Sequence, residues 1–139
     1  MREVLEERIG MWLADPDSSV GYAEEVEGRW AVRMHQEVRD ATTVWFTVGE
    51  RSLSFEAYLI PAPPDPTEAH RQALVRNMRA WRCFYAVDGE GGLVIRGRVA
   101  AERVTLEELD RVLGEIYEMV EVGFRPMVAA GWRDREKSA

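Results

Sequence analysis

Three consecutive stretches between residues 30 and 59 alternate apolar and polar side chains with a period of two. Their apolar positions are Trp30, Val32 and Met34, then Val44, Phe46 and Val48, and finally Leu53, Phe55, Ala57 and Leu59. An extended strand places every second side chain on the same face, and short connections join these stretches. The pattern therefore predicts three antiparallel strands in succession, with one face turned toward a core.

Helical spacing appears on both sides of these strands. The first helix is expected to bury Leu5, Ile9, Trp12 and Leu13. A proline-rich break over residues 62–66 ends the strands, and Asp65 followed by Pro66 is typical of a helix start. This second helix is expected to bury Leu74, Met78 and Trp81. The apolar spacing of these residues follows one face of a helix with 3.6 residues per turn.

The last third of the chain predicts a hairpin and a long helix. Residues 83–87 and 93–99 are rich in apolar and β-branched side chains and flank the glycine-rich turn 88–92. Thr105 and Glu108 form the pattern of a capping box, from which an amphipathic helix runs toward Phe124. Pro126 is expected to kink or interrupt this helix. The glutamate-rich residues 21–28 are read as a loop or a weak strand.

The order of elements predicts the α+β class: a helix, three antiparallel strands, a helix, two strands and a long C-terminal helix. Helices should cover one face of the sheet and leave the other face free. Nothing resembling a linker or an internal repeat divides the sequence. We expect a single domain over residues 1–132, followed by a charged C-terminal tail at 133–139.

The net charge limits the classes of partner. The 25 acidic residues outnumber the 18 basic ones and give a net charge of −7, which argues against binding to nucleic acid. No apolar run is long enough for a membrane span, and the first residues are too acidic for a secretory signal. We therefore expect a cytoplasmic protein that does not bind a membrane.

Few residues offer metal or catalytic chemistry. One cysteine and two histidines cannot complete a Cys/His zinc site, so neither a metal nor a cofactor is expected. His35 is expected on the outward face of its strand, but no serine or cysteine nucleophile is tied to it by spacing. Cys83 lies in an apolar strand and is interpreted as a small buried hydrophobe. The sequence thus predicts no catalytic residue and no enzyme.

The strongest candidate site is a protein-binding face on the sheet. Its expected residues point away from the core set and are Trp45, Tyr58, Tyr85, Arg33 and Arg96. Tryptophan, tyrosine and arginine are enriched in binding hot spots, so this face could receive another protein or a second copy of the chain. The apolar side of the second helix is the other candidate interface. Core packing would explain the same aromatic residues, and the adjacent Phe84 and Tyr85 leave open which ring faces inward.

An alternative function is a small-ligand-binding protein or an enzyme. Its pocket would lie between the sheet and the last helix and would be lined by Phe46, Phe55 and Tyr117.

A family resemblance supports the protein-binding interpretation. The order of elements resembles the YbjN-type bacterial family, as do Trp45 and Phe46, Tyr58, the proline-rich break, residues 77–81 and the hairpin before Thr105. The resemblance covers residues 1–132, and that family is related in fold to type III secretion chaperones. It implies a two-layer α/β sandwich, frequent homodimers and a role in binding or regulating proteins, described as regulation of sensory transduction. No catalytic residues carry over. We therefore expect a homodimer with a protein partner that the sequence does not identify.

Overall fold

The computed structural model describes residues 1–133 and contains three α-helices, six strands and two short 3₁₀ turns. In chain order the elements are α1 (Arg2–Ala14), β1 (Val20–Val26), β2 (Arg29–His35), β3 (Ala41–Val48), β4 (Ser52–Ile60), α2 (Pro66–Arg76), η1 (Asn77–Arg79), β5 (Cys83–Val87), β6 (Leu93–Ala100), η2 (Ala101–Arg103) and α3 (Leu106–Gly131). The predicted helices and strands are confirmed. Residues 134–139 of the predicted tail lie outside the described residues.

The sheet has one strand more than the five predicted. The glutamate-rich segment forms β1, which pairs antiparallel with β2. Glu27 and Gly28 connect the two strands, and both have positive φ angles, of 51° and 82°. Two successive positive φ angles are the geometry of a tight hairpin turn, which brings β1 into register despite its weak apolar pattern.

All six strands form one antiparallel sheet with the order β1-β2-β3-β4-β6-β5. On its inner face Phe46 pairs across to Phe55, and Phe55 pairs across to Gly97. The two phenyl rings are buried, with centroids 6.2 Å apart. A side chain at Gly97 would meet the Phe55 ring at 2.8 Å, so this position needs a glycine to let the ring pack against the sheet.

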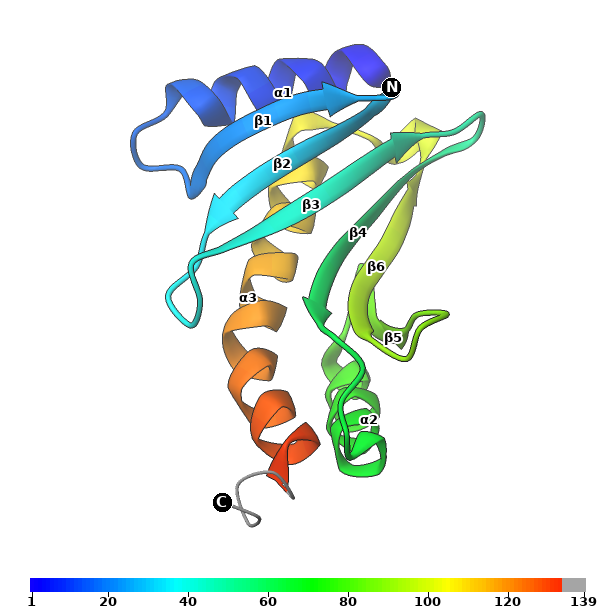
Figure 1. The fold of residues 1–139 in the computed structure, drawn as a ribbon. Coiled ribbons are helices and arrows are strands. Elements are labelled where there is room, and N and C mark those ends of the chain that lie inside the picture. The colour runs from blue at the N-terminus through cyan, green and yellow to red at the C-terminus, as the bar shows by residue number, and fades with distance from the viewer. Residues whose placement is uncertain (134–139) are drawn as a thin grey trace.

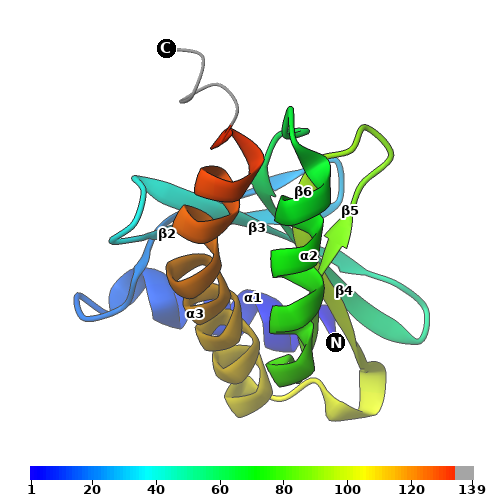
Figure 2. The same cartoon turned by 90° about the horizontal axis from the view of Figure 1, so that it is seen from below.

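The helices form the second layer of a two-layer sandwich. Figure 1 shows α3 behind the sheet and α1 lying along its β1 edge, and the view from below in Figure 2 shows α2 beside α3. From α1, Leu5, Ile9 and Trp12 are buried, and the Trp12 indole donates a hydrogen bond of 2.8 Å to Asp110 on α3. Leu13 is exposed, contrary to the predicted stripe.

The long helix α3 begins at its predicted cap. The Thr105 hydroxyl accepts a hydrogen bond of 3.1 Å from the Glu108 amide. Pro126 was expected to kink or interrupt the helix; an interruption is not observed, because α3 continues to Gly131. Proline removes the hydrogen bond to the carbonyl four residues earlier, at Val122. Val122 is exposed, so water has access to this part of the helix.

The predicted buried stripe of α2 is also wrong. Ala69 and Ala73 are the buried residues of this helix, whereas Leu74, Met78 and Trp81 are 69%, 88% and 82% exposed. The reason is a close approach of α2 to α3 through small residues. A side chain built at Gly131 of α3 would lie 3.6 Å from the Ala69 methyl group. A larger residue on the inner side of α2 would hold the two helices apart.

Candidate protein-binding surface

The open face of the sheet carries four of the five predicted binding residues. Trp45, Arg33 and Arg96 alternate with the buried positions of their strands, and Tyr58 on β4 is 53% exposed. One row of the ladder runs from Trp45 through Glu56 to Arg96. The structure thus brings these side chains to one face of the sheet, as predicted.

Charged groups pair across this face and cover its aromatic centre. The guanidinium of Arg29 lies 4.7 Å from the centroid of the Trp45 ring, and Arg29 also donates a hydrogen bond of 3.1 Å to Thr47. Arg96 and Glu56 form an ion pair of 3.9 Å. Trp45 is consequently half-buried. The open face therefore mixes aromatic and charged side chains, and its ladder row continues from Arg96 to the exposed Phe84 on β5.

Tyr85 does not belong to the open face, which corrects the prediction. Its side chain is 4% exposed and points toward α3, where its hydroxyl donates a hydrogen bond of 2.5 Å to the Met119 carbonyl. Burial raises the pKa of this hydroxyl, with smaller effects from nearby charged groups. The neighbouring Phe84 faces outward instead. The tyrosine takes the inner position because its hydroxyl finds an acceptor there.

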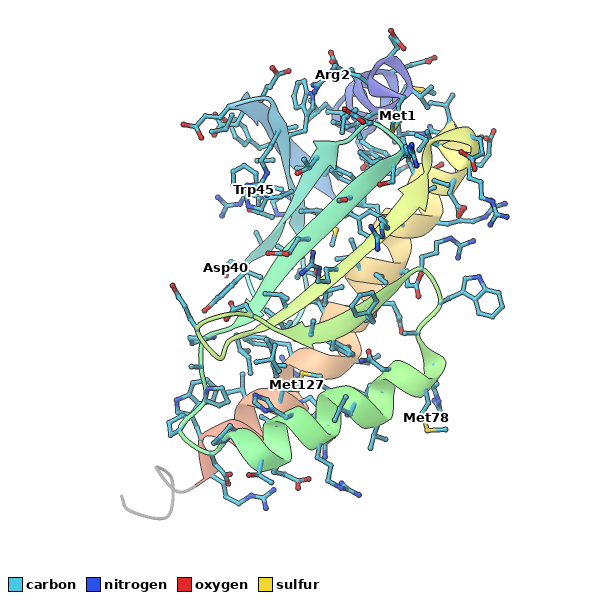
Figure 3. All side chains as sticks on the ribbon, turned by 90° about the vertical axis from the view of Figure 1, so that its right-hand side faces the viewer. Met1, Arg2, Asp40, Trp45, Met78 and Met127 are labelled. Atoms are coloured by element: carbon cyan, nitrogen blue, oxygen red, sulfur yellow. The ribbon has the colours of Figure 1, made fainter. Side chains whose placement is uncertain are left out.

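A different surface gathers exposed apolar side chains along α2, η1 and the link between η1 and β5. We call it the apolar surface, and its residues are Leu74, Val75, Met78 and Trp81. In Figure 3, Met78 projects away from the fold at the end of the green helix, and Trp45 lies at the opposite end of the molecule. Large exposed apolar side chains concentrated in one segment are typical of a contact surface.

Hydrogen bonds from Asn77 and Glu115, most of them partly buried, fix the backbone that carries this surface. The Asn77 side chain forms two hydrogen bonds with the backbone of Tyr85, of 3.0 and 2.8 Å. The carboxylate of Glu115 on α3 accepts hydrogen bonds from the amides of Trp81 and Arg82, of 2.7 and 2.9 Å. The link between η1 and β5 is therefore attached at both ends, so the apolar side chains project from a fixed backbone.

A groove of about 550 Å³ lies beside the apolar surface, between α2, β5 and α3. Val75, Tyr85, Met119 and Val122 supply its apolar part. Arg76, Arg79, Glu115 and Glu118 supply its charged part. An apolar groove with charges of both signs suits a peptide or a helix better than a strongly charged ligand.

The predicted ligand pocket is not formed by the three residues assigned to it. Phe46 and Phe55 are buried against each other in the core. Tyr117 instead borders a shallow cleft with Asp17 and Asp110. The two phenyl rings occupy the space between the sheet and α3 in which the pocket was expected.

Within the described residues, the side chains that could act as nucleophiles or metal ligands do not gather into one site. Cys83 is buried with its sulfur 3.3 Å from that of Met119, and burial, followed by the nearby Glu115, raises the pKa of its thiol. The interpretation of Cys83 as a buried hydrophobe is confirmed. Among residues 1–133, no three His, Cys, Asp or Glu side chains converge into a group that could hold a metal ion. No helix of the same range is long and apolar enough to span a membrane.

Sequence comparison finds mycobacterial relatives of this chain. No family model matches the chain. An uncharacterized protein of Mycobacterium leprae is 33% identical over 106 residues, which cover 76% of this chain and 58% of that protein. An uncharacterized protein of Mycobacterium tuberculosis is 34% identical over 88 residues, covering 63% of this chain and 48% of the other. The chain therefore spans about half the length of these relatives.

Two solved structures share the architecture. A chain of the HopA1–SchA chaperone–effector complex matches with a TM-score of 0.59 at 15% identity, covering 89% of this chain and 91% of that chain. YbjN, a proposed transcription regulator from E. coli, matches with a TM-score of 0.54 at 12% identity, covering 94% and 93%. Both likenesses confirm the predicted YbjN-like, chaperone-like α+β fold.

Proposed function

We propose, from the chaperone-like fold that this chain shares with YbjN, that it is a non-enzymatic protein-binding domain with a chaperone-like or regulatory role in the cytoplasm. Its contact site is the apolar surface of α2, η1 and the link between η1 and β5. The exposure of Leu74, Met78 and Trp81 is the observation that carries the proposal. Leaving three large apolar side chains in water costs free energy that contact with a partner recovers.

The rival surface is the open sheet face with Trp45, Tyr58, Arg33 and Arg96. There the tryptophan already contacts Arg29, and Arg96 already pairs with Glu56. A partner would have to replace these contacts, whereas the apolar surface offers side chains that are unpaired with any charge. The apolar surface is therefore the better supported of the two.

A second copy of the chain is the first occupant we propose for the α2 part of this surface. In a two-fold homodimer the same residues of both copies meet, so an apolar helix face needs no separately evolved complement. Leu74, Val75 and Met78 lie within about one turn and a half of each other and present such a face. Burial of these side chains would supply the hydrophobic part of the association free energy.

The test compares paired variants of the two surfaces. Sedimentation velocity over a wide concentration range measures self-association of the natural chain, of Leu74→Ser with Met78→Ser, and of Trp45→Ala with Tyr58→Ala. We expect the first pair to weaken association at least tenfold and the second pair to leave it unchanged. Circular dichroism checks that both variants are folded.

Capture of a partner completes the test. The tagged chain and both double variants are incubated with lysate of the source bacterium, cross-linked mildly and analysed by mass spectrometry. A protein recovered in near-stoichiometric yield by the natural chain should be lost with the α2 variant and retained by the sheet variant. Folded α2 variants that associate and capture partners like the natural chain would overturn the proposed surface.

A further inference from the structure

A second cleft lies at the end of the apolar surface, where the link between η1 and β5 meets the end of β6. Its volume is about 320 Å³. Trp81, Arg82, Val99 and Glu108 form part of its lining, together with Arg98 and Arg103. Three arginines in one small cleft stand out in a chain whose net charge is −7.

Within residues 1–133, two of these three positive charges have no negative partner. Arg82 forms an ion pair with Glu108, which neutralises both groups. Arg98 and Arg103 are exposed, and neither forms an ion pair or a side-chain hydrogen bond with another residue of the described range 1–133. The cleft therefore holds an excess of about two positive charges, which raises the local potential and attracts anions.

Trp81 adds an apolar platform to this cleft. Its amide is held by Glu115, as is the amide of Arg82, so the backbone beneath the ring is fixed. The indole itself is 82% exposed. A tryptophan on a fixed backbone beside guanidinium groups is the composition of a binding hot spot, because its large ring offers contact area with few rotatable bonds to immobilise.

We infer that the cleft formed by Trp81, Arg98 and Arg103 binds a short acidic segment of a protein partner, with carboxylates on the two arginines and an apolar side chain against the indole. The inference rests on the proposed protein-binding function and adds the chemistry of the partner. A guanidinium presents a planar fork of donors that matches a carboxylate in two parallel hydrogen bonds.

The size and charge of the surroundings favour a short peptide over nucleic acid. A duplex binds through many phosphate contacts along an extended basic surface. Here the cleft is small and its lining carries an excess of about two positive charges, in a chain whose net charge is −7. A short acidic segment can enter it, while a long polyanion would also meet the negative charges around it.

The test uses two fluorescein-labelled peptides that differ in charge alone. One contains Glu-Glu-Leu-Glu-Glu between glycine spacers, and the other carries glutamine in place of every glutamate. Fluorescence anisotropy measures binding of each to the full chain at low and at high salt. We expect the acidic peptide to bind at least tenfold more tightly at low salt and to lose this advantage at high salt.

Matched variants test whether the peptide binds in this cleft. Arg98→Gln with Arg103→Gln should abolish the preference for the acidic peptide. Arg125→Gln with Arg133→Gln removes the same charge about 25 Å or more along α3 from Glu108 and should leave the preference intact. Trp81→Ala should weaken the binding of both peptides.

Several results would overturn the inference. These are equal binding of the two peptides, no binding of either at millimolar concentration, an unchanged preference in the Arg98 and Arg103 variant, and tighter binding of a labelled DNA duplex than of the acidic peptide. The proposed function fails on different evidence, namely unchanged self-association and partner capture in the folded Leu74 and Met78 variant. A failure of one is therefore distinguishable from a failure of the other.

Discussion

The carboxamide of Asn77 pairs with the backbone of Tyr85 as a neighbouring strand would. Its nitrogen donates to the Tyr85 carbonyl at 3.0 Å, and its oxygen accepts from the Tyr85 amide at 2.8 Å. β5 is an edge strand, so these backbone groups have no strand partner on that side. One side chain from η1 thus supplies hydrogen-bond partners to the backbone groups at the middle of this edge strand. It also attaches the apolar surface to the sheet.

Replacing this side chain should destabilise the fold. Asn77→Leu leaves the amide and carbonyl of Tyr85 without partners in a half-buried place, and we expect a loss of about 1–3 kcal/mol in the free energy of unfolding. Urea unfolding followed by tryptophan fluorescence measures it. Asn77→Asp keeps the acceptor and should give a smaller loss. An Asn77→Leu variant with an unchanged urea midpoint would show that the pairing contributes nothing.

The two faces of α2 should differ in their sensitivity to changes in side-chain size. Ala73→Leu inserts bulk where α2 meets α3, and we expect a destabilisation of about 1–3 kcal/mol. Leu74→Ala removes an exposed side chain and should change the unfolding free energy by less than about 0.5 kcal/mol. Both are measured in dilute protein, below the range of self-association. Equal effects of the two substitutions would contradict the orientation of the helix.

Gly123 on α3 is required by the position of Tyr85. A methyl group at this residue would clash with the Tyr85 hydroxyl oxygen. It would also lie 3.0 Å from the ring carbon that carries this hydroxyl. Gly123→Ala should therefore destabilise by about 1–2 kcal/mol, even though alanine favours a helix more than glycine does. In a Tyr85→Phe background the hydroxyl is absent, and the cost should fall by about 1 kcal/mol. Strictly additive effects in this double-mutant cycle would exclude the contact.

Glu121 should make the stability depend on pH in the acid range. Desolvation raises its pKa, but hydrogen bonds from Gln36 and from the amides of Glu37 and Val38 outweigh that effect and hold the pKa of the carboxyl below its usual value. A lowered pKa in the folded state gives stability that is present above the ordinary pKa and is lost as pH falls through the folded value.

The corresponding variant is Glu121→Gln. It should lower the melting temperature at pH 7, and its difference from the natural chain should shrink below about pH 4, where the carboxyl of the natural chain takes up a proton. Differential scanning calorimetry across this range measures the difference. Glu118→Gln, an exposed change on the same helix, serves as the control. A gap between Glu121→Gln and the natural chain that stays constant with pH would contradict the role of the carboxylate.

Most of the fold follows from local patterns in the sequence. Strands β2, β3 and β4 are predicted because one face of each is buried, which imposes strict alternation. β1 is harder to recognise, because its side chains are mostly exposed and pairing with β2 across the Glu27–Gly28 turn makes it a strand. Pairing of this kind is a property of the whole sheet and leaves little trace in the segment itself.

The site is harder to predict, because burial on a helix depends on what it packs against. Leu74 and Met78 follow helical spacing as well as Ala69 and Ala73 do, and hydrophobicity alone favours the larger pair for the core. The inner pair is alanine because α3 approaches closely at Gly131. The four-residue spacing of Ala69 and Ala73 on α2 was the available signal.

The orientation of Tyr85 could have been found from its neighbours. Cys83 was interpreted as buried, and in a strand the residue two positions along shares its face. That alternation places Tyr85 inside and Phe84 outside, as observed. Polarity alone would favour the phenyl ring of Phe84 for the core. The Met119 carbonyl, however, provides an acceptor that allows the Tyr85 hydroxyl to be buried.

The separation of an alanine face on α2 from the exposed Leu74 and Met78 of α2 and η1 also bears on how such a surface can vary. Substitutions at Leu74 or Met78 leave the contact between α2 and α3 untouched, so their cost in stability should be small. Larger residues at Ala69 or Ala73 would disturb the packing and should cost more. Under the proposed function, this separation lets the contact surface change while the fold is kept.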